Sequence, residues 1–195
     1  GRIKRRTGHE RSGAYKGYYT VTGKEYRLSA GGADAAADCR CPEAKHIFTA
    51  GAGRSGLAMR AFSMRLMHLG FQVNCVGDIC STHSAPGDLL LIGSGSGETE
   101  SLAALARKAK KNGVKIALVT TDEDSTIAGM ADVVVVMPGV SPKWKGEGNG
   151  FTSIQPMASA FEQMCFLMYD GIVLELMEKL GETSETMFTR HADLE

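Results

Sequence analysis

Glycines and serines alternate at residues 93–97, where the sequence reads GSGSG. The apolar run Leu89–Ile92 precedes them, and a helical pattern follows from Glu98 or Thr99. Alternate glycines let a backbone turn sharply and direct its N–H groups inward, and serine hydroxyls add further donors. The N-terminus of the following helix contributes a partial positive charge at the same place. The combination suits a phosphate monoester, although the same composition also serves as a plain turn between a strand and a helix.

A second glycine-rich turn, GAGRSG, occupies residues 51–56 between the short apolar run His46–Ala50 and a helical pattern from Ser55 to about Leu69. It matches the G-x-G-x-x-G pattern of dinucleotide-binding folds, so a dinucleotide site is one interpretation. A single match of this kind is weak evidence, and neither turn contains the G-K-[ST] of a Walker loop.

Glu162 is a candidate for proton transfer. Its neighbours along a predicted helix are the apolar residues Ala158, Phe161, Cys165 and Phe166. A carboxylate withdrawn from water is a stronger base than a solvated one, which suits general acid–base catalysis near neutral pH. In local sequences of this kind, however, a glutamate more often faces solvent or pairs with a basic residue.

The overall composition argues against several classes of protein. The 195 residues include 22 Lys+Arg and 22 Asp+Glu, so the formal net charge is zero and no overall basic field favours nucleic acid. No apolar run is long enough to cross a bilayer and no signal peptide is recognised, which predicts a cytoplasmic protein without a membrane partner. Five irregularly spaced cysteines indicate free thiols, and five scattered histidines argue against a metal site.

Five short apolar runs predict buried strands, and helical patterns separate them. The runs lie at residues 46–50, 71–76, 89–92, 115–120 and 133–137. Strands that alternate with helices predict an α/β fold, a three-layer sandwich in which helices cover both faces of a parallel sheet. Right-handed crossovers place the turns after the first and third strands together at the carboxyl edge of the sheet. Two glycine-rich turns in one crevice predict a phosphate site more strongly than either turn alone.

A long helix is predicted from Pro156 to about Leu180. Its apolar residues recur at helical spacing, and others widen the apolar surface until it nearly surrounds the helix. Such a helix has to be covered on most sides, so it predicts a subunit interface. The start of the chain shows no helical spacing of apolar residues. It is basic and rich in glycine. We therefore divide the chain into an atypical, irregular segment at residues 1–45 and one folded domain at residues 46–195.

Seven stretches, taken in order, resemble one family. They read GAGRSG (51–56), RLMHLGF (65–71), GDLLLIGSGSGET (87–99), ADVVVVMPG (131–139), IQPM (154–157), FEQ (161–163) and SETMFTRHADLE (184–195). Together they resemble the 6-phospho-3-hexuloisomerases, which are sugar isomerase (SIS) domain proteins. The resemblance runs from about His46 to Glu195, and it displaces the dinucleotide interpretation of GAGRSG.

The resemblance implies a five-stranded parallel sheet flanked by helices, the flavodoxin-like SIS fold, usually assembled as a homotetramer. It implies interconversion of D-arabino-hex-3-ulose 6-phosphate and fructose 6-phosphate through an enediol, in formaldehyde fixation by the ribulose monophosphate route. The functional partner that it implies is the hexulose-phosphate synthase, which joins formaldehyde to ribulose 5-phosphate. No metal and no organic cofactor is implied.

The resemblance also suggests site residues. The family's two phosphate-binding loops match seven residues of this chain: Gly53, Arg54, Ser55, Ser94, Gly95, Ser96 and Thr99. The family's candidate base falls on Glu162, and its R-H-A motif places His191 as a second acid–base group, for ring opening or for the hydroxyls. A histidine so close to the C-terminus is also placed to serve a neighbouring subunit's site, or simply to lie at the surface.

Two features leave alternatives open. The first forty-odd residues depart from the family, whose members usually begin with an amphipathic helix that packs against the long C-terminal helix. A non-catalytic SIS module that binds a phosphosugar as a sensor or regulator would keep the Ser94–Thr99 loop, but it would need neither Glu162 nor His191.

Overall fold

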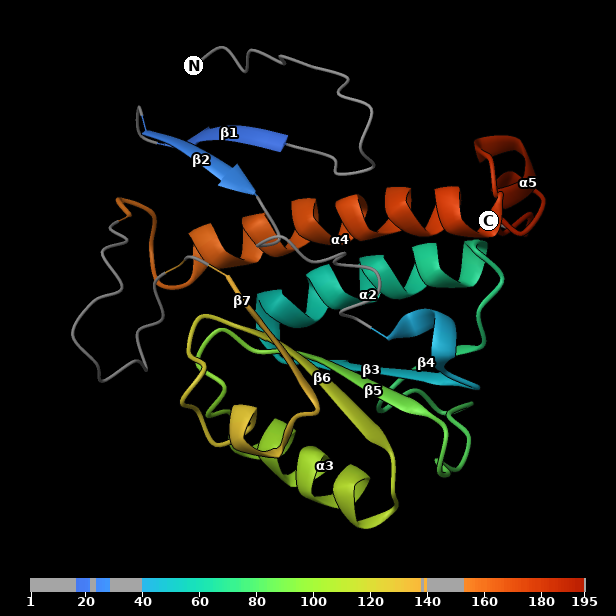
Figure 1. Ribbon diagram of the computed structural model, residues 1–195, viewed down its shortest axis with the longest axis horizontal. Coiled ribbons are helices and arrows are strands. Elements are labelled where there is room, and N and C mark those ends of the chain that lie inside the picture. The colour runs from blue at the N-terminus through green and yellow to red at the C-terminus, as the bar shows by residue number, and fades with distance from the viewer. Residues whose placement is uncertain (1–16, 22–23, 29–39, 138, 140–152, 195) are drawn as a thin grey trace.

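A computed structural model of the chain describes residues 17–21, 24–28, 40–137, 139 and 153–194. Five strands form a central sheet in the order β4-β3-β5-β6-β7, and every neighbouring pair is parallel (Figure 1). These strands are β3 (Ile47–Gly51), β4 (Val73–Cys75), β5 (Leu89–Gly93), β6 (Lys115–Thr120) and β7 (Val133–Val136). The predicted five-stranded α/β fold is therefore confirmed.

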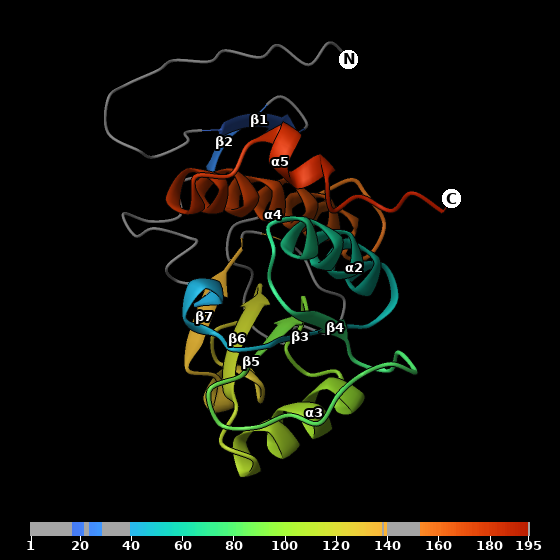
Figure 2. The same ribbon diagram turned by 90° about the vertical axis from the view of Figure 1, so that its right-hand side faces the viewer.

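Helices cover both faces of the sheet, which makes the three layers expected from the sequence. Figure 2 shows α2 and α4 on one face and α3 on the other. The helices are α2 (Gly53–His68), α3 (Glu100–Lys111), α4 (Ser159–Leu180) and α5 (Ser184–Phe188), with short 3-10 turns η1 (Cys41–Glu43) and η2 (Ala128–Met130). Alternate residues of one strand serve the two layers: Leu89 and Leu91 pack toward α2 and α4, whereas Leu90 and Ile92 pack toward α3.

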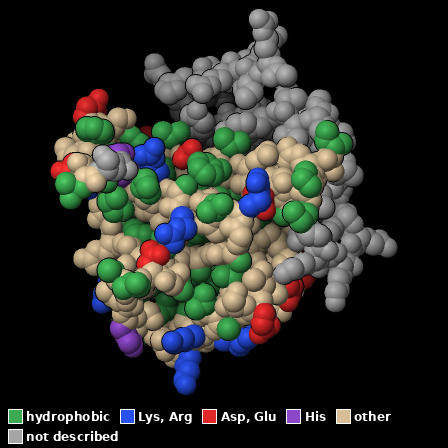
Figure 3. Space-filling model, turned by 180° about the vertical axis from the view of Figure 1, so that it is seen from behind, with side chains coloured by type: hydrophobic (Ala, Val, Ile, Leu, Met, Phe, Trp, Pro, Cys, Tyr) green, Lys and Arg blue, Asp and Glu red, His purple; other side chains and the backbone are tan. Residues whose placement is uncertain are grey.

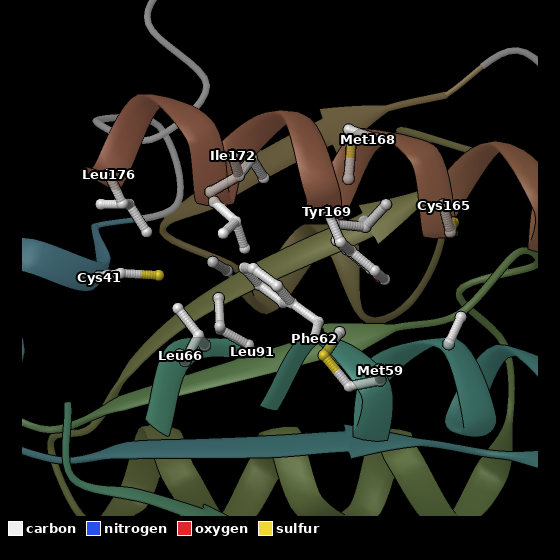
Figure 4. Close-up of a cluster of buried hydrophobic side chains, with 14 of the residues drawn as sticks. Cys41, Met59, Phe62, Leu66, Leu91, Cys165, Met168, Tyr169, Ile172 and Leu176 are labelled. Carbon is white, nitrogen blue, oxygen red and sulfur yellow. The ribbon is translucent and has the colours of Figure 1, made fainter. Parts of the chain in front are cut away.

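The layer formed by α2 and α4 has a close-packed core (Figure 4). Phe62 of α2 stacks on Tyr169 of α4 with ring centroids 4.7 Å apart and planes 9° from parallel. Ile172 and Leu176 of α4 are buried in the same cluster, together with Leu66 of α2. Large apolar side chains in such a core contribute about 2–5 kcal/mol each when truncation to alanine is the measure.

The apolar residues of α4 fall into two sets. The side that includes Met168 and Ile172 is buried within the single chain. A second set, which contains Phe166, Leu167 and Leu174, remains exposed. Only this outer set is free to contact another subunit, because the inner set already packs against α2 and the sheet.

Two further regions differ from the sequence expectation. α4 begins at Ser159, three residues after the predicted start at Pro156. Most of residues 1–45 lies outside the described residues, but β1 (Gly17–Val21) and β2 (Lys24–Leu28) form an antiparallel pair within this segment. Their tyrosines and valine have high β-propensity, which accounts for strands where an irregular segment was predicted. Among the described residues, none of the helices is long and apolar enough to span a membrane.

Candidate active site

The two glycine-rich turns meet at one edge of the sheet. β3 pairs with β5 from Ile47 opposite Leu89 up to Gly51 opposite Gly93, so both strands end at the same level. The first turn is tight, because a Cβ at Gly51 would lie 2.7 Å from the Cα of Gly56. α2 starts directly behind it at Gly53, whose φ of 56° favours glycine. The carboxyl edge therefore carries two helix N-termini, those of α2 and α3, as the sequence predicted.

Residues at the carboxyl end of β6, and Thr121 directly after it, hold the loop Ser94–Thr99 by hydrogen bonds. The Gly95 carbonyl oxygen accepts hydrogen bonds from the Thr121 backbone N–H at 3.0 Å, the Thr121 hydroxyl at 2.7 Å and the Thr120 hydroxyl at 3.1 Å. The Ser94 N–H donates to the carbonyl oxygen of Val119 at 2.9 Å. Sequence analysis did not single out Thr120 and Thr121, although their place directly at the end of a buried strand is a usable signal.

These contacts leave several donors of the loop without a partner. Among the described residues, the backbone N–H groups of Ser96 and Thr99 have no acceptor, and the hydroxyls of Ser94 and Thr99 make no hydrogen bond. The Ser96 hydroxyl accepts from the Glu98 N–H at 3.2 Å, which keeps the loop curled. Free donors beside the N-terminus of α3 are the chemical requirement for binding an anion.

The first turn of α4 packs directly on this loop. A Cβ at Gly95 would lie 3.1 Å from Cδ1 of Phe161, whose side chain is fully buried. A Cβ at Gly139 would lie 3.0 Å from Cβ of the same phenylalanine. Both glycines thus allow a close approach of α4, and the residue that follows Phe161 is Glu162. Phe161 thus connects the first turn of α4 to the predicted phosphate loop.

Glu162 pairs with Arg54. The Arg54 Nε donates a hydrogen bond to Oε2 of Glu162, across 108 residues of sequence. The Glu162 side chain is 14% exposed, and that of Arg54 is 60% exposed. Both expectations for Glu162 are met in part, because the carboxylate is largely withdrawn from water and also has a basic partner. The pair lies in a groove of about 480 Å³ between α2 and α4, whose other lining residues are Leu57, Ala58, Gln163, Phe166 and Leu167.

The outer surface around this groove is rich in apolar side chains. Figure 3 shows this side of the molecule, with hydrophobic groups scattered over α2 and the adjoining α4. Leu57 and Met64 of α2 and Phe166 of α4 are among the exposed large hydrophobic residues. The groove that holds the Arg54–Glu162 pair is therefore bordered by exposed apolar side chains.

Two other ionisable groups of α4 are poor candidates for proton transfer. Burial raises the pKa of the Cys165 thiol to about 12 and raises the pKa of Tyr169 well above its usual value. Both groups consequently stay protonated at neutral pH, and neither is ready to accept a proton from carbon. No group of three or more His, Cys, Asp and Glu residues is placed to hold a metal ion within the described residues.

His191 lies at the other end of the molecule from the two loops. Its ring stacks on His68, with centroids 5.3 Å apart, and on Phe188, with centroids 5.6 Å apart. Arg190 donates to the carbonyl oxygen of His68 at 2.8 Å. His68 is the last residue of α2, and that helix of 16 residues spans roughly 24 Å from the loop edge. Within one chain, therefore, the structure brings Arg54 and Glu162 together but keeps His191 apart (Figure 1).

A family model described as the SIS domain matches residues 42–168. The chain belongs to the SIS domain family. Among curated proteins, it is 54% identical over 149 residues to the 3-hexulose-6-phosphate isomerase of Bacillus subtilis, covering 76% of this chain and 80% of that one. It is 42% identical over 149 residues to the enzyme of the same name from Mycobacterium gastri, covering 76% and 73%.

The solved structures agree with this placement in the SIS family. A protein of Methanococcus jannaschii superposes with a TM-score of 0.70 and 32% sequence identity, covering 83% of this chain and 85% of its own. Its structure is described as inferring a molecular function of 3-hexulose-6-phosphate isomerase. The predicted resemblance to the 6-phospho-3-hexuloisomerases within the SIS family is confirmed.

Proposed function

We propose that this SIS domain is a 3-hexulose-6-phosphate isomerase that interconverts a hex-3-ulose 6-phosphate and fructose 6-phosphate. The observation that carries the proposal is the 54% identity to a curated isomerase of that name over most of both chains. The geometry of the carboxyl edge supports it, because the loop Ser94–Thr99 has free hydrogen-bond donors, and Phe161, which packs on that loop, directly precedes Glu162.

The reaction requires one base and a firm hold on the substrate. Moving the carbonyl from C3 to C2 removes the proton on C2, forms a 2,3-enediol, and returns a proton to C3, while the hydroxyl protons exchange between the two oxygens. We assign Glu162 as the group that takes the first proton and returns the second. A carboxylate suits this task, because it can accept the proton from one carbon and return it to the neighbouring carbon.

We assign the substrate phosphate to the loop edge. Ser94, Gly95, Ser96 and Thr99 supply the free N–H and hydroxyl donors there, and Gly53 and Ser55 start the neighbouring helix. Binding energy from a phosphate remote from the reacting carbons holds C2 and C3 in position, and this lowers the entropic cost of proton transfer. Arg54 is treated separately below, because its contact is with the base.

Three further assignments complete the proposal. Since His191 is remote from the loops of its own chain, its acid–base role requires that it reach the site of a neighbouring subunit. The exposed apolar side of α4 supports an oligomer, for which the family resemblance suggests a tetramer. Coupling to a hexulose-phosphate synthase and a cytoplasmic location follow from the proposed reaction.

Deuterium exchange tests the reaction directly. With fructose 6-phosphate in deuterated water, the proposed enzyme introduces deuterium at C3 through the 2,3-enediol, and NMR locates the label. Deuterium at C1 instead would indicate an aldose–ketose isomerase. Absence of any exchange, together with saturable binding of the sugar phosphate, would contradict the proposal and favour the sensor.

Replacing Glu162 with glutamine tests the base. The amide keeps the shape and can hydrogen bond, but it cannot accept a proton, so we expect kcat to fall by about 10²–10⁴ with little change in KM. Asp170→Asn is a matched control, because Asp170 is an exposed carboxylate further along α4 and should leave both constants unchanged. If Glu162→Gln keeps most of the turnover, the base is another residue.

A further inference from the structure

Arg54 makes its contact with the side chain that we assign as the base. It is the second residue of α2, and among the described residues the one hydrogen bond of its side chain goes to Oε2 of Glu162. The other carboxylate oxygen, Oε1, makes no hydrogen bond to a described residue. Glu162 thus has one oxygen occupied by a guanidinium and one oxygen free.

The electrostatics of the groove explain why Glu162 needs this partner. Leu57, Ala58, Phe166 and Leu167 line the same groove as the carboxylate, and Arg54 is the one cationic side chain among the described residues that line it. A charged group that is largely removed from water has to be paired and hydrogen-bonded, or its charged form becomes costly. Arg54 therefore supplies the pairing and the hydrogen bond that a largely buried carboxylate requires.

The length of the substrate separates the two ends of the site. In a hexulose 6-phosphate, five bonds lie between the reacting carbon C3 and the phosphorus atom. A guanidinium that holds the base lies at the reacting end, and one planar group cannot also be centred on a phosphate at the far end. The free donors of Ser94, Ser96 and Thr99 are the groups that we assign to the phosphate.

We propose that Arg54 is a positioning residue for the base: it holds Oε2 of Glu162 so that Oε1 faces C2 and C3 of the sugar, and it does not bind the substrate phosphate. This inference rests on the proposed isomerase function. It gives Arg54 a different task from the phosphate contact that the family resemblance suggested. An orienting partner of this kind matters because a misplaced base loses rate even when the substrate stays bound.

The first test separates effects on catalysis from effects on binding. In Arg54→Gln, we expect kcat to fall by about 10- to 100-fold, while KM and the inhibition constant of inorganic phosphate change by less than about threefold. Arg54→Lys keeps the positive charge and should recover part of the lost kcat. Arg60→Gln is the matched control, since Arg60 lies on the same helix but pairs with Asp78, and its kcat should stay at the wild-type value.

The second test is a double-mutant cycle with the base. If Arg54 acts through Glu162, then Arg54→Gln should add less than about a twofold loss when Glu162 is already glutamine. If Arg54 binds phosphate instead, the losses multiply, and the affinity for inorganic phosphate measured by titration falls in both backgrounds. That result would overturn the inference. Because the arginine side of the pair is exposed, we expect Arg54→Lys to keep the wild-type melting temperature within a few degrees, whereas Arg54→Gln leaves the largely buried Glu162 carboxylate unpaired and should lower it.

Failure of this inference and failure of the proposed function give different results. A wild-type protein that introduces no deuterium at C3 overturns the isomerase function, and the role of Arg54 falls with it. A wild-type protein that turns over normally, but whose cycle is additive or whose Arg54→Gln variant loses phosphate affinity, overturns only the positioning role. Normal turnover with a non-additive cycle and unchanged phosphate affinity supports both.

Discussion

Replacing Gly97 with alanine is expected to deform the predicted phosphate loop more than any substitution of its serines. Gly97 has a φ of 61°, a region that non-glycine residues rarely adopt. A Cβ at this position would overlap both Oγ and Cβ of Ser125 and would lie 3.4 Å from the Thr120 hydroxyl. Ser125 is almost fully buried, so it has little room to move aside.

The size of the effect follows from three separate costs. The left-handed conformation costs a non-glycine residue about 1–2 kcal/mol. Overpacking against a buried neighbour costs about 1–3 kcal/mol. Displacing Ser125 also breaks the hydrogen bond that its hydroxyl donates to the Asp122 carbonyl at 2.9 Å, which contributes about 0.5–1.5 kcal/mol. We therefore expect Gly97→Ala to lower the free energy of unfolding by about 3–6 kcal/mol, a large part of the stability of a typical domain.

A second variant separates the overlap from the backbone strain. Ser125→Gly removes both overlapping atoms, so the Gly97→Ala/Ser125→Gly double variant should regain the overpacking part but keep the strain at residue 97. Gly129→Ala is the control, because no heavy atom lies within 4 Å of the added Cβ and φ is not positive there. Urea unfolding measures stability, and titration with inorganic phosphate reports the state of the loop. A Gly97→Ala protein with wild-type stability and phosphate affinity would refute this account of the loop.

Two further predictions concern His68 at the C-terminal end of α2 and the exposed apolar residues of α4. Burial, with smaller contributions from nearby Arg65 and His191, lowers the pKa of His68 below its usual 6.5, so the folded protein binds fewer protons than the unfolded chain. The free energy of unfolding should therefore be highest above about pH 6.5 and decrease as the pH falls through the folded-state pKa of His68. Urea unfolding at several pH values measures this, and a His68→Gln variant with the same pH dependence as the wild type would contradict it. Lysine at Phe166 and Leu174 together should leave each chain folded but reduce the mass measured by light scattering, and an unchanged mass would move the subunit interface elsewhere.

Much of the fold is determined by local patterns in the sequence. The continuous apolar run at Leu89–Ile92 is buried on both faces, as a central strand of a parallel sheet has to be, and the GSGSG that follows it turns at once into α3. Gly181 ends α4 in the left-handed conformation, directly after Leu180, where the sequence predicted the end of the helix. Such features are predictable because strand burial, helix period and glycine turns each depend on residues within one short stretch of chain.

The candidate site depends on contacts that no local pattern encodes. Arg54 and Glu162 are 108 residues apart, and they meet only because α2 and α4 pack side by side on the same face of the sheet. Ser125 restricts Gly97 from a different loop, and His191 stacks on His68 rather than approaching Glu162 within its own chain. Sequence alone identified Glu162 as a glutamate among apolar neighbours, but the tertiary structure decided which cation it pairs with. The reason is physical: an ion pair in an apolar groove requires two side chains whose separation is set by helix packing, not by their spacing along the chain.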